Sequence, residues 1–207
     1  MPDDPVLAEA LKALAAPGLL IGHRVIQPGD DAALLPAELA TIPTSNLLTR
    51  RASGAARMVA RKFLAELGHD TAAIPKRVNG CPIWPAGITG SFAHDERVSV
   101  IAIGRERHAG GSVGIDVEPA DDLPAETLDL IATPAEKSRI GDDPYRGRLL
   151  FTAKEAVYKA LYPLDGQFLE FHDIEIDLKA GKAAVKGNRQ VKVAFCVSTH
   201  LVALALA

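Results

Sequence analysis

The sequence predicts a mixed α+β fold of two closely packed halves, and three observations support this class. Apolar residues recur at helical spacing in three segments: residues 6–14, 47–67 and 145–162. Apolar runs typical of strands fill a first group of segments, residues 19–26, 88–93, 98–104 and 112–118, and a second group, residues 171–178, 183–185, 191–199 and 201–206. No low-complexity linker separates these segments, so we divide the chain into residues 1–110 and 111–207, with the seam near Gly110.

Capping residues and helix breakers set the ends of the two long helices. Either Ser45 or Asn46 can cap the helix at residues 47–67, because both side chains can accept hydrogen bonds from free backbone N–H groups. The helix at residues 145–162 is expected to end at Pro163, since proline lacks the N–H group that continues a helix.

Bulk composition excludes several classes of protein. The 207 residues are 48% hydrophobic and 24% charged with a net charge of -3, without the excess of Lys and Arg that marks a nucleic-acid-binding protein. The two cysteines, Cys81 and Cys196, have neither a zinc-binding spacing nor a disulfide pattern. We find no secretion signal and no apolar run of membrane-spanning length, so we expect a cytoplasmic protein that contacts neither nucleic acid nor membrane.

A group of acidic residues predicts a metal site. Asp116 and Glu118 alternate with Val113, Ile115 and Val117, so both carboxylates point to one side of a strand, roughly 6 to 7 Å apart. Such a pair alone is more often an exposed strand face than a site.

The later helix strengthens the metal interpretation. Glu155 and Lys159 are four residues apart and therefore share a helix face. They could be an ordinary surface ion pair. In the functional interpretation, Glu155 joins Asp116 and Glu118 as a third oxygen ligand, and Lys159 reaches for phosphate oxygens. Three hard acids favour Mg²⁺ over Zn²⁺.

Basic residues gather on the helix at residues 47–67. Arg50, Arg51, Arg57 and Arg61 cover several of its turns, and each could simply belong to a solvated face. As a group they suit a phosphomonoester or a bisphosphate nucleotide. His94, at the end of a predicted strand, could donate a further hydrogen bond to phosphate, although a lone histidine is more often structural.

Four segments, taken in order, resemble the 4'-phosphopantetheinyl transferases, particularly the branch that activates siderophore synthetases, similar to enterobactin synthetase component D. They are Arg57-Met-Val-Ala-Arg61, Trp84-Pro-Ala-Gly-Ile-Thr-Gly-Ser-Phe-Ala-His94, Gly114-Ile-Asp-Val-Glu118 and Phe151-Thr-Ala-Lys-Glu-Ala-Val-Tyr-Lys159. The resemblance implies two similar halves related by a pseudo-twofold axis. It implies an enzyme that moves the phosphopantetheine group of coenzyme A to a serine of an apo acyl, peptidyl or aryl carrier protein and releases adenosine 3',5'-bisphosphate.

The resemblance also implies roles for individual residues. Mg²⁺ is held by Asp116, Glu118 and Glu155 against the pyrophosphate, with Glu155, Lys159 and Asp116 as the catalytic residues. Coenzyme A is held by a basic and polar set: Arg50, Arg51, Arg57, Arg77, Ser91, His94, Lys154 and Lys159. The length and the family favour a monomer.

The chain departs from the family pattern at three points. Ala93 stands where many relatives have a hydroxyl residue before the histidine. Residues 79–82 replace a basic residue before the Trp84-Pro85 pair, so Arg77 or Lys76 is proposed as a substitute. Glu136 matches an additional acid near the metal, but its place three residues after Thr133 equally fits a helix-capping box.

Two other interpretations remain open, and so does the carrier-docking surface. One is a different magnesium enzyme of phosphate-bearing substrates, which the absence of a phosphate-binding glycine loop and of kinase motifs disfavours. The other is a carrier-binding relative without activity, which the complete set of acids and Lys159 disfavours. Carrier proteins are expected to dock on exposed apolar residues near the seam, for which we considered Ile131, Ile140, Leu149 and Leu150.

Overall fold

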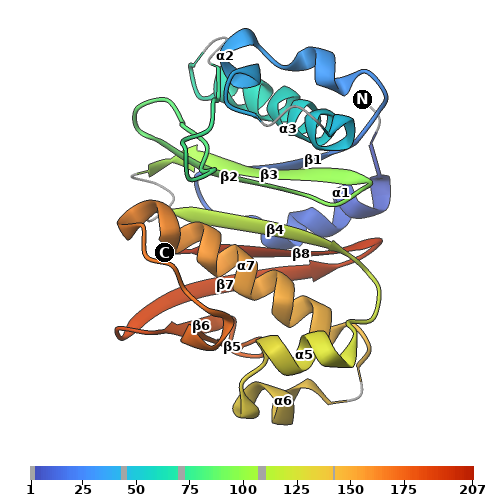
Figure 1. Cartoon of the computed structure of the whole chain (residues 1–207), viewed down its shortest axis with the longest axis vertical. Helices are drawn as coiled ribbons and strands as arrows, with labels where there is room; N and C mark the ends of the chain where they lie inside the picture. The colour runs from blue at the N-terminus through green and yellow to red at the C-terminus, as the bar shows by residue number, and fades with distance from the viewer. Residues whose placement is uncertain (1–2, 43–45, 70–72, 107–110, 142) are drawn as a thin grey trace.

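A computed structural model describes residues 3–42, 46–69, 73–106, 111–141 and 143–207. Two antiparallel sheets form its centre (Figure 1). The first has the order β1-β3-β2, with β1 at Leu19–Val25, β2 at Ile88–His94 and β3 at Val98–Arg105. The second has the order β4-β8-β7-β6-β5, with β4 at Val113–Pro119, β5 at Ile174–Asp177, β6 at Lys182–Val185, β7 at Arg189–Val197 and β8 at His200–Leu206.

Each sheet carries one 20-residue helix, α3 at Leu47–Glu66 or α7 at Arg146–Asp165. The shorter helices are α1 at Pro5–Leu11, α2 at Pro36–Leu39, α5 at Ala125–Ile131 and α6 at Pro134–Ile140. In Figure 1, α3 lies above the first sheet, α7 crosses in front of the second, and α5 and α6 lie at the bottom. The predicted α+β class in two halves is thus confirmed. None of the described helices is long and apolar enough to cross a membrane.

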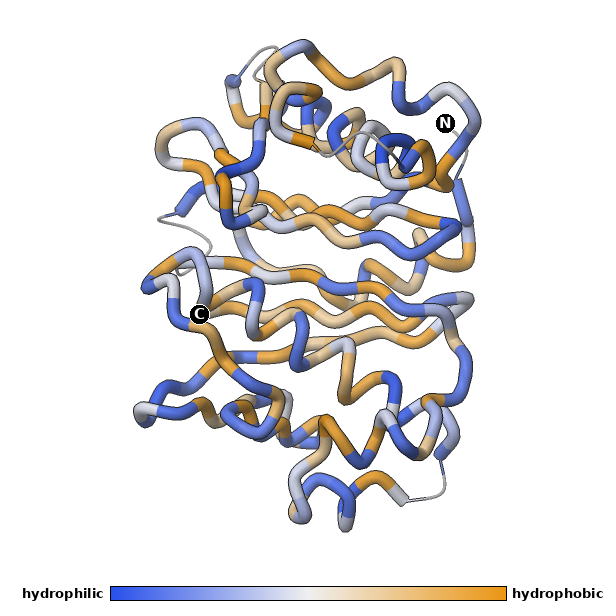
Figure 2. Tube along the Cα trace, in the orientation of Figure 1, coloured by the Kyte–Doolittle hydropathy of each residue, from blue (hydrophilic) through white to orange (hydrophobic). Residues whose placement is uncertain are grey.

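Strand alternation sorts apolar side chains into layers. On β3, Ile101 and Ile103 face the α3 side, whereas Val100 and Ala102 face the second sheet. Residues of α1 and the apolar side of β4 complete this middle layer, so the two sheets share one core. Figure 2 shows the hydrophobic stretches running along these central strands. The halves therefore fold against each other and fix the position of β4 between them.

Most predicted elements are confirmed within one or two residues, and two details are corrected. The α7 helix continues past Pro163 to Asp165, where Gly166, at φ 67°, ends it. Proline removes only one N–H, and the N–H of Gly166 still bonds to the carbonyl of Tyr162 at 2.9 Å. The segment predicted to begin a strand at Phe171 instead forms a 3₁₀ turn, and β5 starts at Ile174.

The cap of α3 is settled by the structure. The side chain of Asn46 accepts hydrogen bonds from the N–H groups of Leu48 and Thr49. The alternative cap, Ser45, and the predicted seam at Gly110 lie outside the described residues. The division into residues 1–110 and 111–207 stays a prediction, with the two sheets falling on either side of it.

Candidate active site

Gly114, Asp116 and Glu118 share the face of β4 that α7 covers, as the alternation predicts. A Cβ atom on Gly114 would lie 1.9 Å from the carbonyl oxygen of Ala156 and 2.6 Å from the amide nitrogen of Ala160. Only glycine allows two backbones to approach so closely. The contact brings α7 onto β4 beside the two carboxylates.

One stripe of α7 meets these carboxylates. Arg148, Glu155 and Lys159 are seven and then four residues apart, so they lie within about 60° of one another around the helix axis. Lys159 Nζ is 2.6 Å from Asp116 Oδ1, and Arg148 Nη1 is 3.0 Å from Glu118 Oε2. Each acid of β4 is therefore paired with a cation from the same stripe.

The three carboxylates all have raised pKa values, and their charges affect one another. Loss of water contact is the largest cause of a raised pKa at Asp116, at Glu118 and at Glu155. Asp116 further raises the pKa of both glutamates by charge repulsion, while Lys159 opposes the shift at Asp116 and at Glu155. A site in which carboxylates repel one another favours an added cation.

The residues fit a hard cation in chemistry, although no complete set of ligands is assembled. Asp116 Oδ2 is buried and has no hydrogen-bond partner, which is costly for a charged oxygen. Among the residues that the structure describes, no three His, Cys, Asp or Glu side chains are gathered closely enough to hold a metal ion as they stand. The trio Asp116, Glu118 and Glu155 as metal ligands thus stays a prediction.

Positive groups border the acids on the side of the first sheet. His94 ends β2 with an exposed side chain, and its pKa is lowered first by partial loss of water contact and also by the charges of Lys159 and Lys76. The pKa of Lys76 is lowered by burial and by the charges of Arg57 and Lys159. Lys76 and Lys159 line the same pocket, and the charges of both act on His94, so the three side chains border a region that suits a multiply charged anion.

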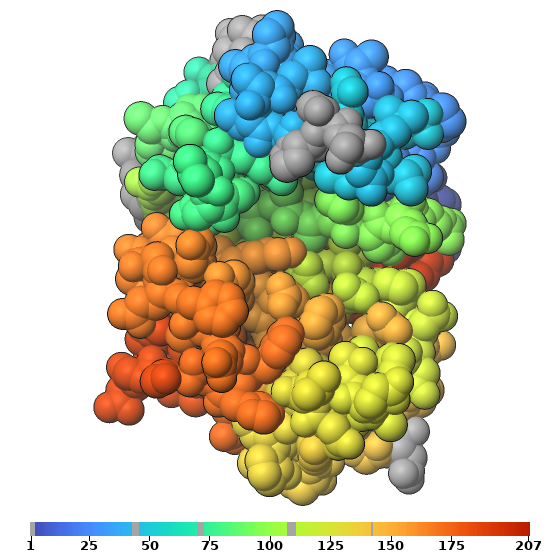
Figure 3. All heavy atoms as spheres, in the orientation of Figure 1, coloured from blue at the N-terminus to red at the C-terminus, as the bar shows by residue number. Residues whose placement is uncertain are grey.

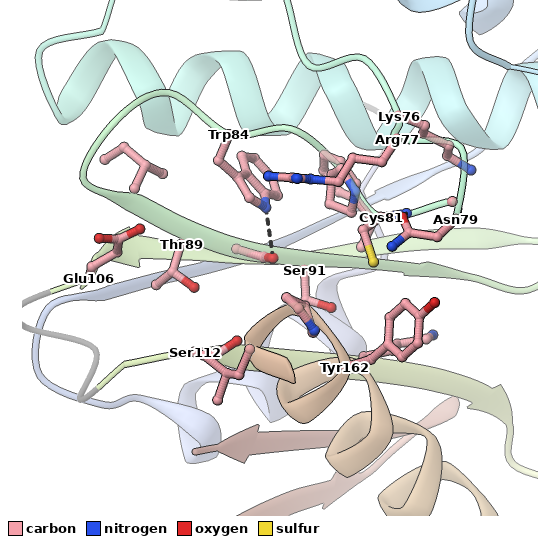
Figure 4. Close-up of a pocket in the computed structure, with 18 of the residues that line it drawn as sticks. Lys76, Arg77, Asn79, Cys81, Trp84, Thr89, Ser91, Glu106, Ser112 and Tyr162 are labelled. Carbon is pink, nitrogen blue, oxygen red and sulfur yellow. Dashed lines mark hydrogen bonds between the residues drawn. The ribbon is translucent and has the colours of Figure 1, made fainter. Parts of the chain in front are cut away.

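A pocket of about 920 Å³ opens beside this region. Figure 3 shows the surface hollowed along the border where the green N-terminal segments meet the orange α7. In Figure 4, Lys76, Arg77 and Trp84 line one side of the pocket and Ser112 and Tyr162 the other. Lys159 lines the pocket as well as contacting Asp116, so it joins the pocket to the acidic group.

Comparisons with known proteins show the family of this chain. The model of the 4'-phosphopantetheinyl transferase superfamily matches residues 112–205, which include β4 and α7, and that of the family's N-terminal domain matches residues 37–104. The 4'-phosphopantetheinyl transferase PptT of Mycobacterium tuberculosis is 39% identical over 161 residues, covering 74% of this chain and 69% of that protein. This chain belongs to the 4'-phosphopantetheinyl transferase family.

The matches to two other relatives cover a smaller share of those relatives' own length. The 4'-phosphopantetheinyl transferase Npt of Nocardia iowensis is 40% identical over 144 residues, which cover 68% of this chain and 64% of Npt. The 4'-phosphopantetheinyl transferase Svp of Streptomyces mobaraensis is 34% identical over 156 residues, which cover 72% of this chain and 63% of Svp. The chain thus matches between 63% and 69% of the length of these three relatives.

Lys154, predicted to bind coenzyme A, has a different place in this transferase-family chain. Its ammonium lies 2.7–2.8 Å from the carbonyl oxygens of Ile131, Phe171 and Ile174, and 2.8 Å from Glu136 Oε2. Because it follows Arg148 by six residues, Lys154 points about 120° away from the stripe that meets β4. The prediction for Lys154 is corrected, because four protein oxygens already surround its ammonium group.

Glu136 belongs to the same buried pair and not to the metal site. It forms the predicted capping box with Thr133, and its Oε1 accepts a hydrogen bond from the Ile176 N–H at 2.6 Å. The structural interpretation of Glu136 is therefore confirmed. The apolar residues considered for carrier docking are also corrected, since all but the half-buried Ile140 are buried: Ile131, Leu149 and Leu150.

The Arg-rich face of α3 is not a simple solvated face, which was one of the two interpretations of its sequence. Arg57 is 1% exposed and donates to the carbonyls of Ile74 and Ser53, while Arg61 bonds to Glu38. Glu38 is fully buried and lies 3.6 Å from Arg57 Nε, and burial lowers the pKa of Arg57 to about 10. Arg57 Cζ lies 5.3 Å from the centre of the Phe92 ring, which lines the pocket while Arg57 does not, and Arg57 Nη2 is buried without a hydrogen-bond partner. The role of Arg57 in binding coenzyme A stays a prediction.

The remaining predicted ligands lie closer to solvent. Arg50 and Arg51 are half-buried, and the Nε atoms of both are buried without a hydrogen-bond partner. Arg77 and Ser91 both line the pocket. Lys76, proposed only as a substitute for a missing basic residue, also lines it.

Sequence reasoning missed three residues of the site and the pocket. Arg148, which pairs with Glu118, could have been found from its spacing of seven residues before Glu155 on the same helix. Tyr158 and Tyr162 both line the pocket, and the centres of their rings are 5.3 Å apart. Their spacing of four residues predicts a shared helix face. None of these three positions carried a signal specific for a ligand.

Proposed function

We propose that this chain transfers the 4'-phosphopantetheine group of coenzyme A to a serine hydroxyl of an apo acyl, peptidyl or aryl carrier protein. The observation that carries the proposal is the position of Lys159, which borders the pocket and lies 2.6 Å from the acidic group at Asp116. A basic pocket joined to clustered carboxylates suits a pyrophosphate substrate together with a divalent cation.

Mg²⁺ would be held by Asp116, Glu118 and Glu155, and it would neutralise charge on the pyrophosphate of coenzyme A. The unpartnered Oδ2 of Asp116 supports this assignment, because a buried carboxylate oxygen without a partner is satisfied by a cation. All three proposed ligands are carboxylate oxygens, and oxygen is the ligand atom that Mg²⁺ prefers.

The chain's own residues would perform the remaining steps. Glu155 would take the proton of the carrier serine as the general base. The serine oxygen would then form a bond to the phosphorus that carries the pantetheine arm. The bond from that phosphorus to the oxygen of adenosine 3',5'-bisphosphate would break. Lys159 would stabilise the charge on the transferred phosphate.

Positive residues around the pocket would hold the nucleotide. Lys76 and His94 would bind phosphate oxygens next to Lys159, and they would be joined by Arg77 and Ser91, which line the pocket with Lys76 and Lys159. Arg50 and Arg51 are our candidates for the 3'-phosphate, since both are only half-buried and the Nε of Arg50 has no hydrogen-bond partner, while Arg51 Nε lies 3.6 Å from Asp31 Oδ1.

Intact-mass analysis tests the proposal. Apo peptidyl, aryl and acyl carriers are incubated separately with the protein, coenzyme A and Mg²⁺. We expect one phosphopantetheine adduct on at least one carrier, lost when its serine is replaced by alanine or when EDTA is present. Unmodified carriers of all three types, with a known transferase modifying each in parallel, would contradict the proposed activity.

A further inference from the structure

The side chain of Arg148 is held in a single orientation by three acceptors. Its Nε donates to the carbonyl oxygen of Asp121 at 3.0 Å, and its Nη2 donates to that of Asp122 at 2.7 Å. The remaining Nη1 donates to Glu118 Oε2 at 3.0 Å. Only 17% of the Arg148 side chain is exposed, so solvent competes little for these bonds.

This pattern requires the fork of an arginine. Two of its donors grip the backbone just after β4, and the third engages the carboxylate at the end of β4. A lysine ammonium is a point charge on a flexible stem and lacks the fixed fork of donors that engages these three acceptors together. Arg148 therefore ties α7 to the segment after β4 and fixes Glu118 at the same time.

Arg148 and Lys159 lie on the same stripe of α7 but make different contacts. Lys159 lines the pocket and is placed to contact substrate, whereas Arg148 lies on the same stripe eleven residues earlier and is not among the residues lining the pocket. The two backbone bonds of Arg148 leave it one contact on the acidic group, which is Glu118 Oε2. Its effect on the reaction must then pass through Glu118.

We propose that Arg148 is a positioning residue that makes Glu118 a one-oxygen ligand and so favours Mg²⁺ over Ca²⁺. Because Oε2 accepts a charge-assisted bond from Arg148, Oε1 is the oxygen that Glu118 has free for a cation. Mg²⁺ takes six ligands and keeps sites for water and phosphate, whereas Ca²⁺ takes more ligands and accepts bidentate carboxylates. This inference rests on the proposed function, because it assigns Glu118 to the metal site.

The test compares Arg148→Met and Arg148→Lys with Arg146→Met. Arg146 is on the same helix but is more exposed and pairs with Asp143, so its variant controls for loss of one positive charge. Mn²⁺ binding in the presence of coenzyme A is followed by electron paramagnetic resonance, and Mg²⁺ and Ca²⁺ compete against it. Circular dichroism and thermal melting report the fold.

For Arg148→Met we expect Mn²⁺ and Mg²⁺ binding to weaken about 10- to 100-fold, the range for lost support of a metal ligand. The ratio of Mg²⁺ affinity to Ca²⁺ affinity, measured by competition against Mn²⁺, should fall. Arg148→Lys should fold at least as well as Arg148→Met because it keeps the positive charge. It should not regain the selectivity for Mg²⁺ over Ca²⁺, because it lacks the guanidinium fork. Arg146→Met should match the wild type.

A double-mutant cycle separates positioning from general stability. In a Glu118→Gln background, adding Arg148→Met should have no further effect on metal binding, because the carboxylate that Arg148 positions is gone. A loss of the same size in both backgrounds would overturn the proposal. If Arg148→Met fails to fold, Arg148→Lys carries the same comparison.

The outcome distinguishes this inference from the proposed activity. Unchanged Mn²⁺ affinity and Mg²⁺ selectivity in Arg148→Met and Arg148→Lys, with a wild-type protein that modifies a carrier, would overturn the role of Arg148 alone. A wild-type protein that binds Mn²⁺ through Glu118 but modifies no carrier would overturn the activity and leave the positioning role standing. Wild-type protein that binds no divalent cation would overturn both.

Discussion

Gly114 and Ala156 are in direct backbone contact, since a Cβ on Gly114 would lie 1.9 Å from the Ala156 carbonyl oxygen. Backbone cannot yield as a flexible side chain can, so Gly114→Ala should push α7 away from β4. We expect a loss of stability of about 1–3 kcal/mol or more, the usual cost of overpacking, and a loss of carrier modification. Urea unfolding and the mass assay measure the two effects.

A control variant locates the effect of that substitution. Gly147→Ala places its Cβ no closer than 3.4 Å to the nearest atom, a Leu123 side-chain atom, so it should be tolerated. Equal destabilisation by both variants would show that the contact between β4 and α7 is not the special constraint we infer.

Asp116→Asn should separate stability from activity. Burial raises the pKa of Asp116, so the fold disfavours its charged form, and a neutral isostere should keep or increase the melting temperature. Carrier modification should fall by at least about 10²-fold in kcat/KM because a charged group of the reaction site is lost. Retention of wild-type kinetics would remove Asp116 from the proposed machinery.

The Lys154–Glu136 pair is expected to matter for folding more than for coenzyme A. Both side chains are almost fully buried, and Lys154→Met leaves the Glu136 carboxylate without its cation. We expect a loss of about 3–5 kcal/mol in the free energy of unfolding. Denaturant titration checks this value.

A companion variant tests the assignment further. In Lys154→Met/Glu136→Gln the unpaired charge is gone, so much of the lost stability should return. If instead Lys154→Met were stable and showed only a raised KM for coenzyme A, the ligand role that the sequence predicts for Lys154 would be correct after all.

His23 should make stability depend on pH. Its Nε2 accepts a hydrogen bond from the Asp4 N–H at 3.0 Å, and burial, the largest cause, lowers its pKa below 6.5. The folded protein therefore holds the neutral imidazole. This contribution is complete above pH 6.5 and is lost as the pH falls from 6.5 through the lower pKa of the folded state.

Thermal melting between pH 7.5 and 5 measures this dependence. In His23→Gln the slope of melting temperature against pH should be shallower, because glutamine can still accept from the Asp4 N–H but does not titrate in this range. An identical slope in wild type and variant would assign the pH dependence to other groups.

The sequence alone was sufficient wherever one element determined the geometry. Strand alternation placed Asp116 and Glu118 on one face, and helical spacing placed Glu155 and Lys159 together, because side-chain direction repeats every two residues in a strand and about every 3.6 in a helix. Gly114 stands in the same alternation, although its close contact with α7 was not predicted.

Only the tertiary structure decided which partner each face meets. Glu38 reaches Arg57 and Arg61 from a distant segment, so a helix face that looked solvated is partly a buried ion-pair network. Lys154 turns into the protein and Arg148 turns to Glu118, although both lie on the helix that carries the reaction site. Periodicity fixes the direction of a side chain relative to its own element, whereas pairing depends on long-range packing that the local sequence does not contain.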